Sequence, residues 1–357
     1  MPDPKFWHGR RVFVTGHTGF KGAWLLLWLQ RLGAQVTGYS IGVPSKPSLF
    51  EVAHVADGLS DLRGDIRDGA TLTKRIKEAA PELVIHAAAQ SLVRTSYTDP
   101  LVTFDTNVMG TAHVLQAIRS CGDVKAVLVL TSDKCYENRE IGVAFQETDP
   151  MGGHDPYSAS KGAAELVTAS MRRSYFQPAS HERHDAAVAS ARAGNVIGGG
   201  DWSDDRIIPD LVRAFSVGTP AMIRNPSAVR PWQFILDLLA GYLRLCECLC
   251  TEGQAVADAW NFGPEPGSAR SVAALTEMAS SLWGVGAHTE VVGGPKPHEA
   301  STLMLDSSKA RLRLGWRPKF DYETAMRLTV DWYRGFYAGT DARKLCDDQI
   351  NHYDRYI

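Results

Sequence analysis

Apolar and polar positions follow two periods along the first half of the chain. Short apolar runs at residues 11–16, 34–40, 82–89 and 125–132 have the length of buried strands, and turn residues bound them. Between them, residues 20–33 and 103–122 carry apolar side chains at helical spacing and end in glycine. Strands that alternate with helices of this length predict right-handed crossovers and a mostly parallel sheet, which is a doubly wound α/β fold.

The pattern continues through a helix at 155–176 and a buried strand at 186–198, and then changes. From about residue 199, prolines interrupt shorter elements. We therefore predict a nucleotide-binding lobe at 1–198 that carries the catalytic residues. A smaller C-terminal α/β substrate lobe at 199–357 is expected to be interleaved with the first.

Composition and charge exclude several classes of protein. The 357 residues are 44% hydrophobic and 22% charged, and 38 basic residues stand against 40 acidic ones. A net charge of −2 without blocks of like charge argues against nucleic acid or an anionic membrane as partner. No apolar run is long enough to span a bilayer, and the N-terminus does not resemble a signal peptide. We expect a cytoplasmic protein.

Three of the six cysteines form the pattern Cys246-x-Cys248-x-Cys250. Residues 234–250 read as an amphipathic helix, in which alternate side chains point in different directions. We therefore favour free thiols over a metal site and predict that the protein binds no metal.

The turn after the first strand is rich in glycine: Gly16, Gly19 and Gly22. This spacing lets the backbone approach a pyrophosphate at the start of the next helix, as in Rossmann-like folds that bind dinucleotides. The second strand ends in Gly38-Tyr39-Ser40, without the acid that usually binds the adenosine ribose and without an arginine. We predict NAD rather than NADP.

The apolar strand at 125–132 ends in Ser132, Asp133 and Lys134, and two interpretations apply. These groups either form a solubilising turn or perform acid–base chemistry. Tyr157 and Lys161 lie four residues apart on the helix at 155–176, so their side chains share one face. A lysine ammonium beside a tyrosine favours the phenolate, which can accept a proton from an alcohol.

The chain resembles the extended short-chain dehydrogenase/reductases that act on nucleotide sugars, from Val14 to about Tyr333. The resemblance rests on "VTGHTGFKG", "HAAAQ", "TNVMGT", "LTSDKCY", "PYSASK", "ARAGNVIGGGDW", "RPWQ", "WNFGP" and "LDSSKARLRLGW", which occur in family order. Sugar 4,6-dehydratases of this family carry Asp-Glu after the strand. Here Lys134 replaces the Glu, which is similar to the subgroup that acts on CDP-glucose.

The resemblance implies a reaction and a catalytic set. Tyr157, with Lys161 and Ser132, would take the sugar O4 proton while hydride passes from C4 to NAD. Asp133 and Lys134 would then serve as acid and base for loss of water across C5 and C6, provided that they do not form a tight ion pair. Which of the two handles the C5 proton stays open.

The resemblance also implies binding residues and an assembly. The NAD set is Gly16, Thr18, Gly19, Phe20, Lys21, Gly22, Asp65, Ile66, Ala87, Ala88, Ala89, Asn107, Tyr157 and Lys161. The CDP-glucose set is Gln90, Asn195, Arg206, Arg230, Gln233 and His298. The helices at 103–121 and 156–176 would pair across a two-fold axis, which predicts a homodimer.

Other interpretations of single residues and of the whole chain stay open. Asp65 binds the adenine or starts a helix, Arg206 binds phosphate or starts a helix, and His298 lines the sugar pocket or a surface turn. Trp202 and Trp232 either approach the substrate or pack in the core. The alternative activities are dehydration or epimerisation of another nucleotide hexose, and a non-catalytic NAD-sensing protein.

Overall fold

A parallel sheet forms the centre of the molecule. The computed structural model describes residues 1–140, 142–177, 184–265, 267–293 and 303–356. Within them, seven parallel strands follow the order β11-β6-β5-β4-β1-β2-β3. Their bounds are β1 (Arg11–Thr15), β2 (Gln35–Ser40), β3 (Ser60–Arg63), β4 (Leu83–His86), β5 (Ala126–Leu130), β6 (Ala187–Ala193) and β11 (Ala259–Phe262). The predicted doubly wound parallel sheet is confirmed.

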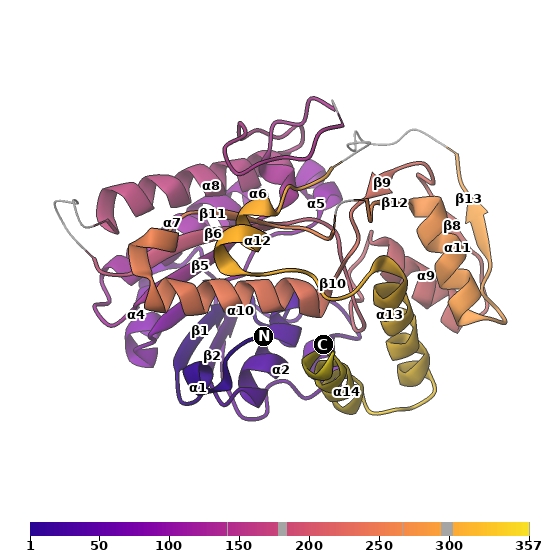
Figure 1. The fold of residues 1–357 in the computed structure, drawn as a ribbon, viewed down its shortest axis with the longest axis horizontal. Coiled ribbons are helices and arrows are strands. Elements are labelled where there is room, and N and C mark those ends of the chain that lie inside the picture. Colours follow the sequence, from indigo (N-terminus) through magenta and orange to yellow (C-terminus); the bar gives the residue numbers. More distant parts are fainter. Residues whose placement is uncertain (141, 178–183, 266, 294–302, 357) are drawn as a thin grey trace.

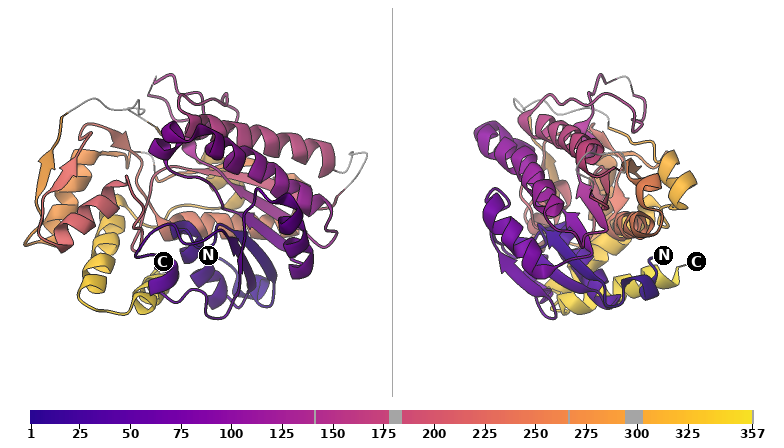
Figure 2. Two further views of the ribbon diagram at one scale, coloured as in Figure 1. Left: turned by 180° about the vertical axis from the view of Figure 1, so that it is seen from behind. Right: turned by 90° about the vertical axis from the view of Figure 1, so that its left-hand side faces the viewer.

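Helices cover both faces of this sheet (Figures 1 and 2). Successive side chains of a strand point to opposite faces, so Phe13 enters one hydrophobic cluster while Val12 and Val14 enter the other. The cluster around Phe13 is closed by α4 (Gly69–Ala79), α7 (Gly110–Arg119) and α8 (Pro156–Tyr175). The other face is closed by α2 (Phe20–Arg31) and α10 (Ile235–Thr251).

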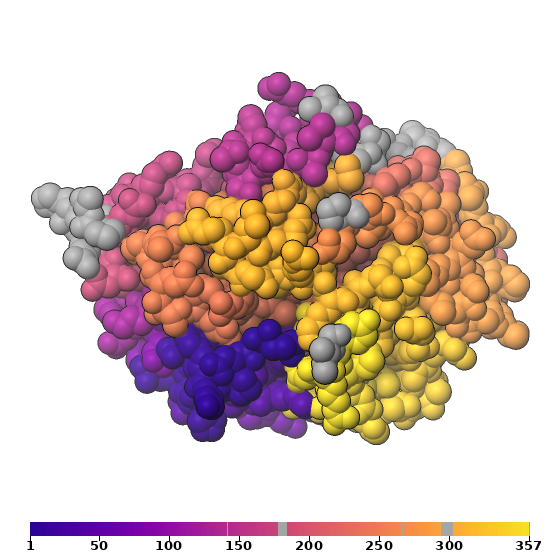
Figure 3. Space-filling model, viewed as in Figure 1, coloured from indigo at the N-terminus to yellow at the C-terminus, as the bar shows by residue number. Residues whose placement is uncertain are grey.

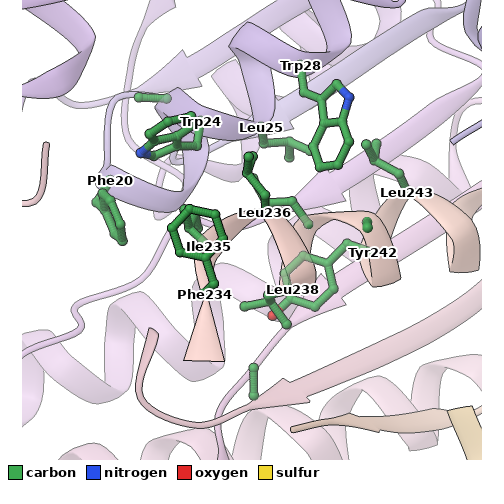
Figure 4. Packing of buried hydrophobic residues seen from close by; sticks show 14 of the residues in the cluster. Phe20, Trp24, Leu25, Trp28, Phe234, Ile235, Leu236, Leu238, Tyr242 and Leu243 are labelled. Atoms are coloured by element: carbon green, nitrogen blue, oxygen red, sulfur yellow. The ribbon is translucent and has the colours of Figure 1, made fainter. Parts of the chain in front are cut away.

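Helix α10 is buried on nearly all sides, so the expected amphipathic helix is a core helix instead. It lies between the sheet, α2 and α12 (Ser308–Leu314). Trp24 and Trp28 of α2 face Leu236 and Leu243 of α10 in this layer (Figure 4). Cys246 and Cys248 are buried, Cys250 is partly buried, and all are free thiols. Among the described residues, no group of three or more His, Cys, Asp or Glu side chains is placed to hold a metal ion.

The helix expected over 103–122 is broken into three pieces. They are α6 (Pro100–Phe104), the π-helical η1 (Asp105–Met109) and α7. Asn107 in η1 donates to the Gln90 carbonyl and to Ser160 Oγ of α8, at 2.9 and 2.8 Å. The wider π turn thus lies where a helix, a loop after β4 and α8 meet, which hydrophobic periodicity does not encode.

The second lobe lies beyond the carboxyl ends of the strands (Figure 1). The strand expected at 186–198 divides into β6 and β7 (Val196–Ile197), and the chain then enters this lobe. Its further elements are α9 (Ile207–Ser216), β8 (Ala221–Ile223), β9 (Val229–Arg230), β10 (Gln233–Phe234), β12 (Arg270–Ser271), α11 (Val272–Trp283), β13 (Thr289–Val291) and α13 (Tyr322–Tyr337).

Residues 199–357 contribute to both lobes, because α10, β11 and α12 return to the large sheet. Helix α14 (Ala342–Arg355) packs on α2, and the N-terminal and C-terminal segments lie side by side at one edge (Figure 3). The remaining elements are α1 (Pro4–Trp7), α3 (Leu49–Val52), α5 (Val93–Thr98), η2 (Asp133–Cys135) and η3 (Gly253–Val256). None of the described helices is long and apolar enough to cross a membrane.

Candidate active site

A cavity of about 330 Å³ lies between the carboxyl end of the sheet and the second lobe. This is the place where doubly wound sheets bind their ligands. Residues from both lobes line it. The predicted site residues among them are Lys21, Ser132, Asp133, Lys134, Tyr157, Asn195, Arg206 and Arg230.

The end of β5 presents Ser132, Asp133 and Lys134 to this cavity. The chain turns there through η2, and Ser132 Oγ accepts from the Lys134 backbone N–H at 3.3 Å. Ser132 Oγ also donates to Asp133 Oδ1 at 2.9 Å, whereas the buried Asp133 Oδ2 has no hydrogen-bond partner. Among the described residues no ion pair joins Asp133 to Lys134, and both residues line the cavity.

Tyr157 and Lys161 lie in the first turns of α8, which Asp155 caps by accepting from the Ser158 backbone N–H. Burial raises the pKa of Tyr157 to about 12, and a hydrogen bond with Ser132 partly offsets this rise. Burial lowers the pKa of Lys161 to about 8, while nearby Glu165 acts in the opposite direction. The phenolate form of Tyr157 that the sequence predicts therefore requires more positive charge near the phenol than Lys161 alone supplies.

A buried hydrogen-bond network that the sequence analysis missed supports Ser132, Lys134, Tyr157 and Lys161. Glu165, one turn after Lys161, pairs with Arg192 at 2.8 Å and accepts from Thr131 and Ser190. Arg192 also donates to the Tyr136 hydroxyl at 2.6 Å. The network joins α8 to the residues that flank Ser132 and Lys134, so it fixes their relative positions. The spacing of Glu165 four residues after Lys161 was the available signal.

The glycine turn meets the loop after β4. Gly16 has φ +72°, and a Cβ on it would lie 2.5 Å from the Ala88 backbone nitrogen. A Cβ on Gly22 would lie 2.4 Å from the Gly16 carbonyl oxygen. Gly19 caps α2 without a side-chain hydrogen bond, so the first N–H groups of the helix can donate to the oxygens of a pyrophosphate. The turn therefore fits a dinucleotide.

The end of β2 lacks the acid that usually binds the adenosine ribose and presents other polar groups there. Ser40 Oγ is buried there and has no hydrogen-bond partner, so it can bind a ribose hydroxyl. Gly38 leaves space for the ring of His17, whose Nε2 lies 2.9 Å from Asp61 Oδ1. Asp61 lies opposite Gly38 in the pairing of β2 with β3, and its Oδ2 accepts from Arg63 Nη2 at 2.7 Å. The corner therefore carries a carboxylate and a guanidinium together, and the unpartnered Ser40 Oγ is the group that fits a ribose hydroxyl of NAD.

Asp65 lies at the same corner, but Asp68 and not Asp65 caps α4. The helix-start interpretation of Asp65 is therefore wrong. Arg67 donates to its carboxylate and lowers the pKa of Asp65. The Asp65 carbonyl oxygen accepts from the Tyr39 hydroxyl at 3.2 Å. The adenine role of Asp65 stays a prediction.

The remaining residues predicted to bind NAD lie in or near the glycine turn and the loop after β4. Thr18 Oγ1 donates to the Gly42 carbonyl, and Phe20 begins α2 in the hydrophobic core. Ile66 is buried against Gly110. The loop of Ala87, Ala88 and Ala89 follows β4, and the Ala88 N–H donates to Thr15 Oγ1 at 3.2 Å.

The substrate candidates lie in different places. Asn195, Arg206 and Arg230 line the cavity. Arg206 occupies the N-cap position of α9 without a side-chain cap, so it does start a helix, and its phosphate role stays a prediction. Gln90 turns away, because its side-chain amide bonds Leu92 and Thr103. Gln233 lies in a separate cavity of about 370 Å³, next to the first across Trp232. His298 lies outside the described residues.

Lys21 has surroundings that the sequence did not indicate, whereas those of Trp202 match one of its two interpretations. Lys21 lies in the cavity among Arg206, Lys161, Asp133 and Asp201. Burial, reinforced by Arg206 and Lys161, lowers its pKa to about 8. Trp202 packs against Trp332, Tyr333 and Phe336, which confirms the core interpretation of that residue.

Comparisons with known proteins agree with this geometry. A family model described as GDP-mannose 4,6 dehydratase matches residues 13–329. A CDP-glucose 4,6-dehydratase from Salmonella typhimurium is 48% identical over 353 residues, which cover 99% of this chain and 98% of that protein. A dTDP-glucose 4,6-dehydratase from Xanthomonas campestris is 27% identical, covering 90% of this chain and 92% of the other. The crystal structure of Thermus thermophilus UDP-glucose 4-epimerase in complex with NAD superposes with a TM-score of 0.78 at 25% identity, covering 91% of this chain and 99% of that one.

Proposed function

The chain belongs to the GDP-mannose 4,6 dehydratase family of nucleotide-sugar enzymes, and we propose that it converts CDP-D-glucose to CDP-4-dehydro-6-deoxy-D-glucose and water, using NAD. The single observation that carries this proposal is the meeting of Tyr157 with Ser132, Asp133 and Lys134 in one cavity that Arg206 and Arg230, among other residues, also line. The 48% identity to a CDP-glucose 4,6-dehydratase supports the choice of nucleotide.

The first step is removal of the O4 proton of the sugar. Bound NAD supplies a reversible hydride acceptor. Tyr157 accepts the O4 proton, and the Ser132 hydroxyl orients the sugar hydroxyl by a hydrogen bond. Because burial holds the pKa of Tyr157 at about 12, a positive charge beside the phenol is needed to favour the phenolate. Lys161, four residues after Tyr157 on α8, would supply part of that charge, and a bound nicotinamide cation would add to it.

The second step is loss of water across C5 and C6. A 4-keto group acidifies the hydrogen on C5, so a base and an acid near each other can remove that proton and the C6 hydroxyl. Lys134 acts as the base toward C5, and Asp133 protonates the leaving hydroxyl. Asp133 Oδ2 is buried and carries no hydrogen bond, which leaves that oxygen free to hold the proton. A reduced nicotinamide would supply the hydride that C6 receives, so the reaction would consume no external oxidant.

The substrate's diphosphate would lie at the second lobe. Arg230 is 2% exposed, Arg206 lies at the start of α9, and both line the cavity. Guanidinium groups bind phosphate oxygens in pairs of charge-assisted hydrogen bonds. Asn195, between β6 and β7, adds an amide donor beside them.

We also propose a homodimer. Leu101 is 78% exposed, Met109 48% and Leu166 60%, and they lie on α6, η1 and α8, which contact one another. A second copy covering this apolar surface would remove these side chains from water. The proposal further places the enzyme in the cytoplasm and its product in deoxysugar synthesis for surface polysaccharides, on the strength of the family resemblance.

The test is a panel of CDP-, dTDP-, UDP- and GDP-glucose with product identification by NMR. We expect the 4-keto-6-deoxy product from CDP-glucose, with the other nucleotides at least ten-fold slower. A preference for another nucleotide would replace CDP-glucose as substrate. A C4 epimer in place of the keto sugar would replace dehydration with epimerisation. Normal NAD binding without turnover of any sugar would favour a sensing protein.

A further inference from the structure

Three charged side chains meet at the mouth of the cavity, and neither the sequence analysis nor the proposed mechanism uses them. Asp205 lies in the loop before α9, Arg94 lies in α5 of the large lobe, and Arg224 follows β8 of the second lobe. Asp205 Oδ1 accepts from Arg224 Nη1 at 2.8 Å and lies 3.2 Å from Arg94 Nη1. One carboxylate oxygen therefore links the two lobes, and all three residues line the cavity.

The backbone of Asp205 adopts an unusual conformation to reach this position. Its φ is +57°, in the left-handed region that residues with a side chain rarely occupy. Aspartate and asparagine tolerate this region better than other residues that carry a Cβ. Conformations of this kind persist where the surrounding structure enforces them, often at binding sites.

The chemistry of the cluster resembles that of a bound phosphate. Two guanidinium groups that converge on one oxygen form a site for an oxyanion, and here a carboxylate of the chain occupies it. The Arg94 and Asp205 side chains are 49% and 33% exposed, so water competes for this ion pair. An entering phosphate can exchange with such a carboxylate.

We propose that Asp205 is a positioning residue, an internal anion that holds Arg94 at the mouth of the cavity and releases it to the diphosphate of an entering nucleotide sugar. Arg224 keeps a second link to Asp210, at 3.3 Å, and so stays with the second lobe. Arg94 has no other ion pair within the described residues, so it is the arginine that changes partner. This inference rests on the proposed nucleotide-sugar substrate.

The proposal predicts that loss of the Asp205 charge strengthens nucleotide binding. Asp205→Asn keeps the shape and tolerates the positive φ but removes the competing charge. In calorimetric titration with CDP, we expect its Kd to be at least three-fold lower than that of the unmodified protein. The KM for CDP-glucose should fall similarly, with kcat within about two-fold. The gain should vanish when Arg94→Met is added, because Arg94 is the group that Asp205 releases.

Asp204→Asn is the matched control, since Asp204 is the adjacent acid, is 86% exposed and pairs only loosely with Arg213, at 3.7 Å. It should leave the Kd for CDP unchanged. Unchanged or weaker CDP binding by Asp205→Asn, or a gain that persists without Arg94, would overturn the inference while leaving the proposed function intact. If the unmodified protein binds no CDP, the proposed function fails first.

Discussion

At the scale of single residues, the chemistry depends on keeping Asp133 and Lys134 apart. Their backbones are adjacent, yet Asp133 turns its Oδ1 to Ser132 and its Oδ2 into the buried interior near Gly194. An ion pair between them would keep the acid deprotonated and the lysine charged, and neither form performs the elimination. The hydrogen bond from Ser132 holds Asp133 in the separated position.

Lys134→Met should slow elimination more than C4 oxidation. Removal of a general base reduces a step by about 10²- to 10⁴-fold, so reduced cofactor should accumulate under saturating CDP-glucose. Stopped-flow absorbance at the reduced-nicotinamide band measures this. Lys74→Met, at a surface position on α4, is the control and should behave as the unmodified protein. Normal turnover of Lys134→Met would remove this residue from the mechanism.

Lys21→Met should stabilise the ligand-free protein at neutral pH. The amine loses its proton above a pKa of about 8 in the folded chain, against 10.5 in the unfolded chain. Below pH 8 both states are protonated, so the cost of burying the charge is fully present. Between pH 8 and 10.5 the unfolded chain binds more protons, so the free energy of unfolding rises with pH.

Denaturant unfolding at several pH values measures this effect. At pH 7 the variant should gain on the order of 1 kcal/mol, and the gain should shrink as the pH rises toward 10. The exposed Lys74→Met should show no such trend. A gain that does not depend on pH would assign the effect to packing instead of charge.

At the scale of elements, the glycine turn and the loop after β4 must approach closely. Gly16→Ala should abolish NAD binding, because its Cβ would lie 2.5 Å from the Ala88 backbone nitrogen. Gly9→Ala is the matched control, since Gly9 has the same φ of +72° but no atom within 4 Å of the added Cβ. It isolates the cost of a positive φ for a residue with a Cβ, about 1 kcal/mol.

Fluorescence titration with NAD measures this difference. We expect at least a hundred-fold rise in Kd for Gly16→Ala and no change for Gly9→Ala. Equal losses in the two variants would show that backbone strain, and not contact between the loops, governs binding.

Elements whose local sequence pattern alone determines their structure could be predicted from the sequence. Strands β1, β2, β4, β5 and β6 and helix α2 are specified by apolar periodicity, and the glycine turn by its spacing. Strands β3 and β11 were not predicted, and β3 lacks a buried apolar run. The π turn of η1 could not, because it depends on Asn107 contacting Gln90 and Ser160, which are distant in sequence. The surroundings of α10 also depend on tertiary packing, since its apolar residues cover more than one face.

At the scale of the whole molecule, the candidate site is formed by two lobes. Ser132, Tyr157 and Arg230 could be predicted because each lies within a family motif. The contact of Asp205 with Arg94 could not, because it joins α5 to the loop before α9 and neither segment has a motif at that position. Gln90 and Gln233 lie within motifs, but the bond of Gln90 to Thr103 and the place of Gln233 in the neighbouring cavity depend on tertiary structure.

If the protein is a homodimer, charged residues placed in its interface should lower the mass of the particle in solution. Leu101→Glu combined with Leu166→Glu should convert the dimer to a 39.0 kDa monomer in analytical ultracentrifugation, because two charges would be buried in an apolar interface. Leu312→Glu is the control, since Leu312 is 83% exposed on α12, away from these helices. An unmodified protein that sediments as a monomer would contradict the proposed dimer.

The most direct test of the account is the fate of the C4 hydrogen. CDP-glucose deuterated at C4 should give a product that carries that deuterium at C6 within the same molecule, because the hydride removed at C4 is returned to C6. NMR and mass spectrometry of the product measure this transfer. Deuterium returned to C4, or lost to an external acceptor, would contradict internal redox dehydration.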